Sequence, residues 1–306
     1  MEQKGNEKRI IVIGSSNTDM VIQSGKLPLP GETVLGGDLI MNAGGKGANQ
    51  AVAAAKLGGN VTFIAKVGDD QFGNSAIREF EDVGIDSRYV VKDPERPSGV
   101  ALIMVDQNGE NCISVALGAN QSLNAQDIDR AESIFKESSY ILVQLEVPLS
   151  TIEYASSKAK AFDIPVVLNP APAQPLSDDL YRNVHIITPN ETETELLTGI
   201  QLDNDEQLKL AGQYFRNKGV STVIITLGSR GAYVLSENVD VIIPGFSAEV
   251  KDTTAAGDTF NGALVVALSE GKSIQSAVQF ANKAASVSVT RMGAQQSIPL
   301  RNELDE

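Results

Sequence analysis

The chain has 306 residues, 42% of them apolar, which is enough to build the sizeable core of a large α/β fold. Its formal net charge of −14 argues against nucleic acid as a partner, because phosphate backbones attract patches of Lys and Arg. The single cysteine, Cys112, excludes an intrachain disulfide and a cysteine-rich metal site, and it favours a reducing compartment, for which we expect the cytoplasm.

The first part of the chain predicts alternating strands and helices with extra short strands between them. Residues 1–9 are polar, contain no signal-peptide core and are expected to form a loose start. No apolar run approaches the ~18 residues of a membrane span. The pattern then predicts a buried strand at 10–13, short exposed strands within 17–43, a helix at 47–57, a strand at 61–67, a helix at 70–83 and a hairpin formed by 99–105 and 112–117.

After residue 120 the alternation becomes regular. Strands are expected at 140–144, 166–168, 185–188 and 223–226, followed by a hairpin within 231–243 and two Ala-rich helices that end near residue 291. This order predicts an α/β fold, a mostly parallel central sheet flanked by helices on both faces. We expect one domain, residues 1–306, in which the segments near 17–43 and 99–117 form a small β-sheet lid.

Several common motifs are missing from the sequence. Lys46 is followed by Gly47, so the chain has no P-loop, and no Rossmann G-x-G-x-x-G follows the first strand. The lone histidine, His185, is interpreted as a core or edge residue of a strand, and Cys112 as a small apolar residue of the hairpin. A P-loop NTPase, a nicotinamide dehydrogenase and a triad hydrolase are therefore disfavoured.

Polar or glycine-rich clusters follow several predicted strands or open a helix. Each has a structural alternative: an Asx turn, a capping box such as Asn190 with Glu193, or a plain connector. Ligands of open α/β sheets gather at the carboxyl ends of strands, so one shared site explains all the clusters. They could hold sugar hydroxyls, phosphate and a hydrated Mg²⁺. The clusters are Asn17 with Asp19, residues 44–49 (GGKGAN), Glu146, Asn190 with Glu193, and residues 226–231 (TLGSRG).

Asp258 lies where an apolar helix is expected to begin, after three small residues, 255–257. The start of a helix presents unpaired N–H groups and the positive end of its dipole, which suits a phosphate. A carboxylate there could act as a general base beside a transferring phosphoryl group. It could equally cap the helix, as Asp often does.

Two of these motifs together resemble the ribokinase or PfkB superfamily of sugar kinases, and the likeness extends over essentially the whole chain. The first runs from Gly44 through the GGKGAN block to Gly68, and the second covers residues 252–258 (DTTAAGD). The resemblance implies a central mostly parallel sheet with a small β lid. Because lids of the family often pair, it also implies a homodimer.

The resemblance assigns roles by position in this sequence. In catalysis, Asp258 would be the base, and Ala255, Ala256 and Gly257 would form the anion hole. The sugar would be held by Asn17, Thr18, Asp19, Gly45, Lys46, Gly47, Ala48, Asn49, Glu146 and Asp258. ATP would contact Asn190, Glu193, Thr226, Leu227, Gly228, Ser229, Arg230, Gly231, Gly257, Asp258 and Asn282. A monovalent cation would lie near Asp252, Thr254, Ser288, Arg291, Gly293 and Ser297.

The activity implied is the phosphorylation of D-ribose at O5 by ATP, with Mg²⁺ and an activating K⁺. Neither nucleic acid nor a membrane is expected as a partner. Two alternatives stay open. One is a related kinase for deoxyribose, fructose or a nucleoside, and the other is a non-catalytic sugar-binding regulator that has kept the fold.

Overall fold

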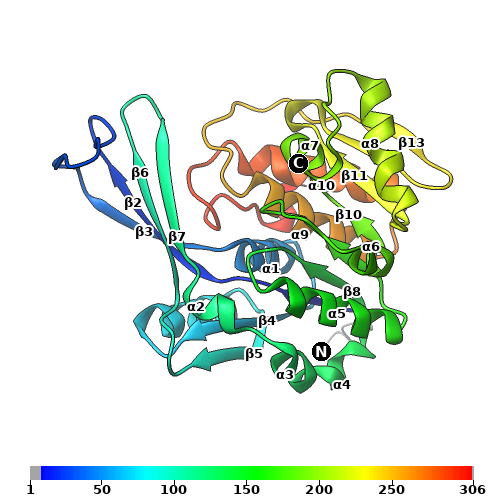
Figure 1. Ribbon diagram of the computed structural model, residues 1–306, viewed down its shortest axis with the longest axis horizontal. Coiled ribbons are helices and arrows are strands. Elements are labelled where there is room, and N and C mark those ends of the chain that lie inside the picture. The colour runs from blue at the N-terminus through cyan, green and yellow to red at the C-terminus, as the bar shows by residue number, and fades with distance from the viewer. Residues whose placement is uncertain (1–7, 305–306) are drawn as a thin grey trace.

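The computed structural model describes residues 8–304, so the expected loose start lies almost wholly outside the described residues. Within this range a nine-stranded sheet runs in the order β13-β12-β11-β10-β9-β8-β1-β4-β5 (Figure 1). Neighbouring strands from β11 to β5 are parallel, whereas β11, β12 and β13 pair antiparallel. Their bounds are β1 Arg9–Ile13, β4 Val61–Gly68, β5 Asp86–Asp93, β8 Ser138–Val143, β9 Val166–Leu168, β10 Ile186–Ile187, β11 Thr222–Thr226, β12 Ala232–Leu235 and β13 Asp240–Ile243.

Helices cover both faces of this sheet, as the alternating pattern predicts. In β1, Ile10 and Val12 enter one buried cluster and Ile11 and Ile13 the other, because successive side chains of a strand point to opposite faces. The first cluster is completed by α1 Lys46–Lys56, α2 Gln71–Asp82, α9 Ala256–Ser269 and α10 Ile274–Ser288. The second is completed by α3 Ala125–Arg130, α4 Glu132–Phe135, α5 Leu149–Ala161, α6 Asp178–Asn183, α7 Glu191–Thr198 and α8 Asp205–Asn217.

A separate small sheet stands off the body of the molecule (Figure 1). Within residues 8–304 it has four strands in the order β3-β2-β6-β7, namely β3 Leu39–Gly44, β2 Asn17–Gln23, β6 Gly99–Val105 and β7 Asn111–Ala116. It unites the two segments that break the alternating pattern. Asp19 of β2 pairs with Asn42 and Ala101, so these side chains share one face of the small sheet. The division into one domain with a moving lid stays a prediction.

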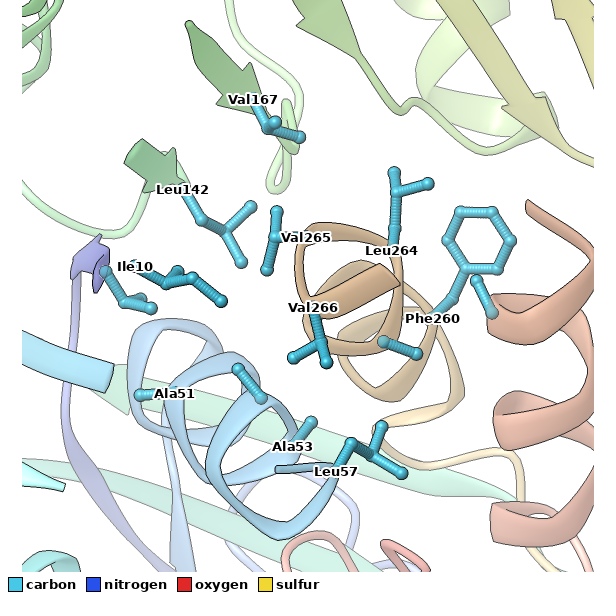
Figure 2. Packing of buried hydrophobic residues seen from close by; sticks show 14 of the residues in the cluster. Ile10, Ala51, Ala53, Leu57, Leu142, Val167, Phe260, Leu264, Val265 and Val266 are labelled. Carbon is cyan, nitrogen blue, oxygen red and sulfur yellow. The ribbon is translucent and has the colours of Figure 1, made fainter. Parts of the chain in front are cut away.

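Helices α1 and α9 pack closely where Gly262 faces α1. A Cβ added at Gly262 of α9 would lie 2.5 Å from the Cβ of Ala53 and 2.8 Å from the backbone nitrogen of Ala54 in α1, so Gly262 permits the contact. Figure 2 shows α9 beside α1, with Val266 toward α1 and Val265 toward Leu142 of the central strands. This close crossing places the first residues of the two helices side by side.

The mostly parallel sheet, its flanking helices and the second small sheet confirm the predicted fold class. Strand β5 was not predicted. His185 is exposed and precedes β10 rather than lying in the core, and Cys112 is exposed on β7 rather than packed as an apolar residue. In the part of the chain that the structure describes, no helix is long and apolar enough to cross a membrane.

Candidate active site

Asp258 lies in the first turn of α9 and does not cap it. The cap position is Ala255, whose φ of +58° is rare for a residue with a side chain. The buried carboxylate instead accepts hydrogen bonds from two side-chain amides of α1, from Asn49 Nδ2 to Oδ2 and from Gln50 Nε2 to Oδ1, both 2.9 Å long. The capping alternative is therefore wrong, and Asp258 is held in place from a second helix.

Burial raises the pKa of Asp258, and the nearby Glu146 carboxylate adds to the rise. The Lys46 ammonium and the amides of Asn49 and Gln50 oppose it, because each stabilises the ionised form. The pKa of Asp19 is raised to about 6, first by burial and then by Glu146 and Asp258. Carboxylates that were far apart in the sequence thus share one electrostatic environment with a single lysine, as expected for acid–base chemistry.

The glycine-rich turn before α1 is shaped by close backbone contacts. Gly45 has a φ of +91°, and a Cβ there would lie 2.8 Å from the backbone nitrogen of Asn17. A Cβ at Gly44 would lie 2.2 Å from an oxygen of the Asp19 carboxylate. The glycines therefore let the turn lie directly against β2, beside the predicted sugar-binding residues.

Glu146 fastens this turn to the end of the central sheet. Its carboxylate accepts hydrogen bonds from the backbone N–H of Lys46 (3.0 Å) and from the Ser15 hydroxyl (2.5 Å). Ser15 also accepts from Gly47 N–H through its hydroxyl (3.3 Å) and from Ala48 N–H through its carbonyl (2.8 Å). Of the predicted sugar set, Gly47 and Ala48 thus fix the turn, while Lys46 is partly exposed.

The strand β2 supplies the other predicted sugar ligands. Asn17 is buried, and its Oδ1 accepts a hydrogen bond of 2.8 Å from Asn120 Nδ2. That bond leaves the Asn17 amide N–H groups for a ligand. Asn17 and Asp19 share one face of the small sheet, whereas Thr18 points to the opposite face.

A cavity of about 200 Å³ lies beside Asp258. It joins the start of α9 to the glycine-rich turn and to the carboxyl ends of the central strands, where ligands of open α/β sheets bind. Its lining residues are Lys46, Asn169, Ala171, Thr188, Asn190, Glu193, Thr226, Thr253, Ala255, Ala256, Gly257, Asp258 and Asn261.

Asn190 and Glu193 form the capping box of α7 and also line this cavity. Asn190 Oδ1 accepts from the Glu193 N–H (2.7 Å), and the Glu193 carboxylate accepts from the Asn190 N–H (2.9 Å). The structural alternative is thus confirmed, and it does not exclude contact with a ligand. Burial raises the pKa of Glu193, and Asp258 adds to the rise.

The predicted nucleotide segment 226–231 connects β11 to the antiparallel β12 through a 3₁₀ turn at Gly228–Arg230. Thr226 lines the cavity, and Arg230 lies beyond it in an ion pair of 2.8 Å with Glu191. Asn282 of α10 donates to the carbonyl oxygens of Ile243 (3.1 Å) and Pro244 (3.2 Å). The other predicted members of this segment, which the cavity lining does not include, are Leu227, Gly228, Ser229 and Gly231.

The predicted cation residues come from the loop before α9 and from the end of α10 with the loop after it, and Asp252 links the two. Its carboxylate accepts from the backbone N–H of Thr254 and of Gly293, each at 2.8 Å. Arg291 pairs with Glu303 through its side chain. The hydroxyls of Ser288 and Ser297 each donate to a carbonyl three residues earlier.

The sequence reasoning missed a set of polar residues that lie between Asp258 and the carboxyl ends of the central strands. Gln144, Asn169 and Thr188 each follow the last residue of a central strand, β8, β9 and β10 in turn, and Asn261 follows Asp258 by one turn of α9. Position at the end of a predicted strand was the signal that could have found three of them. Gln50 joins them to Asp258.

Comparison with known proteins adds to this geometry. Residues 7–301 match the profile of the pfkB family of carbohydrate kinases. The chain is 46% identical to a ribokinase of Haemophilus influenzae over 97% of both chains, and 39% identical to a deoxyribokinase of Salmonella typhi over the same shares. Among solved structures, it superposes with a TM-score of 0.91 on Arabidopsis thaliana ribokinase complexed with ribose and ATP, at 32% identity over 97% of both chains.

Proposed function

We infer, since the chain belongs to the pfkB family of carbohydrate kinases, that it catalyses the ATP-dependent phosphorylation of ribose. The observation that carries this inference is the buried Asp258 carboxylate at the start of α9, flanked by Asp19, Lys46 and Glu146. A regulator without catalysis would have no use for a buried carboxylate of raised pKa beside a helix start that can bind phosphate.

The chemistry proposed is in-line transfer of the γ-phosphoryl group. Asp258 takes the proton of the O5 hydroxyl of ribose, O5 bonds to the γ-phosphorus, and the bond to the bridging oxygen of ADP breaks. Hydroxyls of the sugar donate to Asp19 and accept from Asn17, which orients O5 toward Asp258. Lys46 balances the carboxylates that surround the sugar.

The first turn of α9 is the proposed anion hole. Gly257 lines the cavity, and a Cβ added there would meet nothing within 4 Å, so the γ-phosphoryl group can approach the backbone closely. The N–H groups of Ala255 and Gly257 and the helix dipole would stabilise the charge that develops during transfer. The Ala256 N–H donates to the Thr253 carbonyl (3.2 Å) and would have to exchange that bond to join them.

The residues present fit the two cations that we propose. Within residues 8–304 no three acidic, histidine or cysteine side chains are grouped to hold a metal by themselves. Mg²⁺ does not need such a group, because it usually takes most of its ligands from phosphate and water. Glu193 and Asn190 would lie near it. The Asp252 carboxylate and the carbonyls of its loops offer the oxygen ligands that K⁺ requires, and K⁺ there would order the loop that leads into α9.

A panel of sugars tests the substrate. Initial rates of ADP release are measured with ATP, Mg²⁺ and ribose, deoxyribose, fructose or a nucleoside, each with K⁺ and with Na⁺ instead. We expect ribose to be the best substrate and K⁺ to raise its rate. Faster turnover of deoxyribose than of ribose would show that deoxyribose is the substrate. Rates of ADP release that do not depend on any of the sugars would overturn the proposed kinase activity.

We further propose a homodimer formed through the small sheet, working in the cytoplasm. One row of apolar residues crosses all four strands of that sheet, on the face that carries Asp19: Ile40, Val21, Ile103 and Ile113. Ile40 and Ile113 are 45% and 54% exposed. A sheet of this kind is usually covered, and a second copy of the same row would cover it.

Light scattering coupled to gel filtration tests the dimer. The variant Ile113→Asp is expected to be a monomer. Leu210→Asp, which changes a residue of α8 with similar exposure (50%), is expected to remain a dimer. A wild-type protein that stays monomeric at micromolar concentration would contradict the proposal.

A further inference from the structure

Gln50 lies at the centre of a buried chain of amides that ends on Asp258. Its Nε2 donates to Asp258 Oδ1 and to Asn169 Oδ1, both at 2.9 Å, and its Oε1 accepts a bond of 2.6 Å from Gln144 Nε2. Gln50 and Gln144 are fully buried. The Gln50 amide therefore has its two N–H groups and its oxygen bonded inside the protein.

The orientation of every amide in this chain follows from acceptors at its two ends. The ionised Asp258 carboxylate can only accept, so Gln50 must turn its NH₂ group toward it. Asn169 donates from Nδ2 to the backbone carbonyl of Thr188 (3.1 Å), which leaves its Oδ1 for Gln50. Gln144 must then present its NH₂ group to the Gln50 oxygen. No flipped arrangement satisfies the same partners.

The backbone makes room for this chain of amides. A Cβ added at Gly14, just after β1, would lie 2.1 Å from the Gln144 oxygen, so a side chain there would displace the Gln144 amide. Gln144 and Asn169 follow adjacent strands, β8 and β9, and are fixed by the sheet. Gln50 is thus anchored to the rigid centre of the molecule on one side and to Asp258 on the other.

From this geometry we propose that Gln50 is a positioning residue of the phosphoryl transfer, supported by Gln144. It fixes the plane of the Asp258 carboxylate and keeps it ionised, while the side of the carboxylate that faces the cavity stays available for the proton of the sugar hydroxyl. The proposal rests on the proposed role of Asp258 as the base. In addition, the Asp258 carboxylate is held by the amide of Gln50, a residue of α1 that is itself anchored to the sheet, and not by the substrate alone.

The charged groups around Asp258 also affect its pKa, so they must be considered when the pH dependence of the rate is used to test the role of Gln50. Lys46 of α1 lowers the pKa of Asp258, whereas Glu146, after β8, raises it. Asp19 of β2 and Glu193 of α7 also interact with Asp258. All four remain in a Gln50 variant. A shift in the pH profile would therefore report the lost amide, whose hydrogen bond favours the ionised form.

The test compares three single variants with the intact enzyme and, in addition, places Gln50→Met in the background of Asp258→Asn. Gln50→Met keeps the volume of the side chain and removes its polar atoms, Gln144→Met removes the support of Gln50, and Thr151→Val is a control for a buried hydrogen bond away from the site (Thr151 donates to the Leu123 carbonyl at 2.7 Å). The measurements are kcat and KM for ribose and ATP from pH 5 to 9, and the midpoint of thermal unfolding.

For Gln50→Met we expect kcat to fall by on the order of 10-fold or more, KM values to change by less than about 3-fold, and the acid limb of the rate profile to move to higher pH. Gln144→Met should show the same pattern more weakly. Thr151→Val should lose stability without moving the limb. In the background of Asp258→Asn, Gln50→Met should cost nothing further in turnover, because it acts through Asp258.

An active Gln50→Met variant with an unmoved acid limb would overturn the inference, as would a fall in kcat that adds in full to that of Asp258→Asn. A variant that merely unfolds more easily, with normal kcat in its folded fraction, would also overturn it. A wild-type protein without ribose-dependent ADP release would overturn the proposed function instead, so the two failures are distinguishable.

Discussion

Replacing Asp258 by Asn removes the proposed base with almost no change in shape. General-base catalysis contributes about 10²- to 10⁴-fold, so we expect turnover to fall by at least ~10²-fold, equivalent to about 2.7 kcal/mol in the barrier. Ribose affinity, which rests on Asp19, Asn17 and Lys46, should change little. The assays are coupled ADP release for turnover and titration calorimetry for ribose binding.

The same variant makes a prediction about stability that can be worked out from the contacts. An amide offers one acceptor, so either Asn49 or Gln50 would face an NH₂ group, at a cost of about 1–3 kcal/mol. Against this, burial raises the pKa of Asp258, so its ionised form destabilises the folded protein.

The sign of the pH dependence follows from that raised pKa. Because the pKa of Asp258 is higher in the folded than in the unfolded protein, its protonation stabilises the fold fully at pH values below the unfolded pKa near 4. That stabilisation is lost as the pH rises through the pKa of the folded protein. The stability of Asp258→Asn relative to wild type should therefore improve as the pH rises from about 4. Turnover within about threefold of wild type, or a relative stability that worsens with rising pH, would refute the reasoning.

The remaining predictions concern the sugar and phosphate sides of the site. With the pKa of Asp19 raised to about 6, kcat/KM for ribose should fall as pH drops through about 6, because the protonated carboxyl accepts sugar hydroxyls poorly; a flat profile between pH 5 and 7 would contradict this. Gly257→Ala should fold normally but lower kcat/KM for ATP by on the order of 10-fold, since its methyl group would occupy the open space at the start of α9; Gly25→Ala, which also meets nothing within 4 Å, is the control and should be silent. Gly44→Ala should raise KM for ribose, because the added Cβ would lie 2.2 Å from an oxygen of the Asp19 carboxylate and displace it. The same assay measures this, and an unchanged KM would show that Asp19 does not hold the sugar.

The sequence predicts the sheet and most helices well because the central strands are short apolar runs bounded by turns. Strand β5, Asp86–Asp93, escaped prediction for a physical reason. It is an edge strand in which only Val90 and Asp93 are buried, and its apolar run, residues 89–91, is short and lies between the charged residues Arg88 and Lys92. The exposed His185 was misplaced because apolar residues follow it directly, and only the register of β10 shows that the strand begins after it.

The site was predictable where a residue type and a position both pointed to chemistry, as for Asp258, Asn17 and Glu146. Gln50 was not predictable in this way. It sits in an Ala-rich helical pattern, and its partner Asp258 is 208 residues away. Their meeting depends on the close crossing of α1 and α9, which in turn depends on Gly262 lying against Ala53, and no local pattern reveals it.

Identification of the reaction product tests the central claim most directly. The wild-type protein is incubated with ATP, Mg²⁺, K⁺ and isotopically labelled ribose, and the position of the new phosphate ester is read by ³¹P and ¹³C NMR. We expect ADP and ribose phosphorylated at O5 in equal amounts from the wild type, and almost no product from Asp258→Asn. Phosphate at another hydroxyl, free inorganic phosphate in place of the ester, or equal product from Asp258→Asn would contradict it.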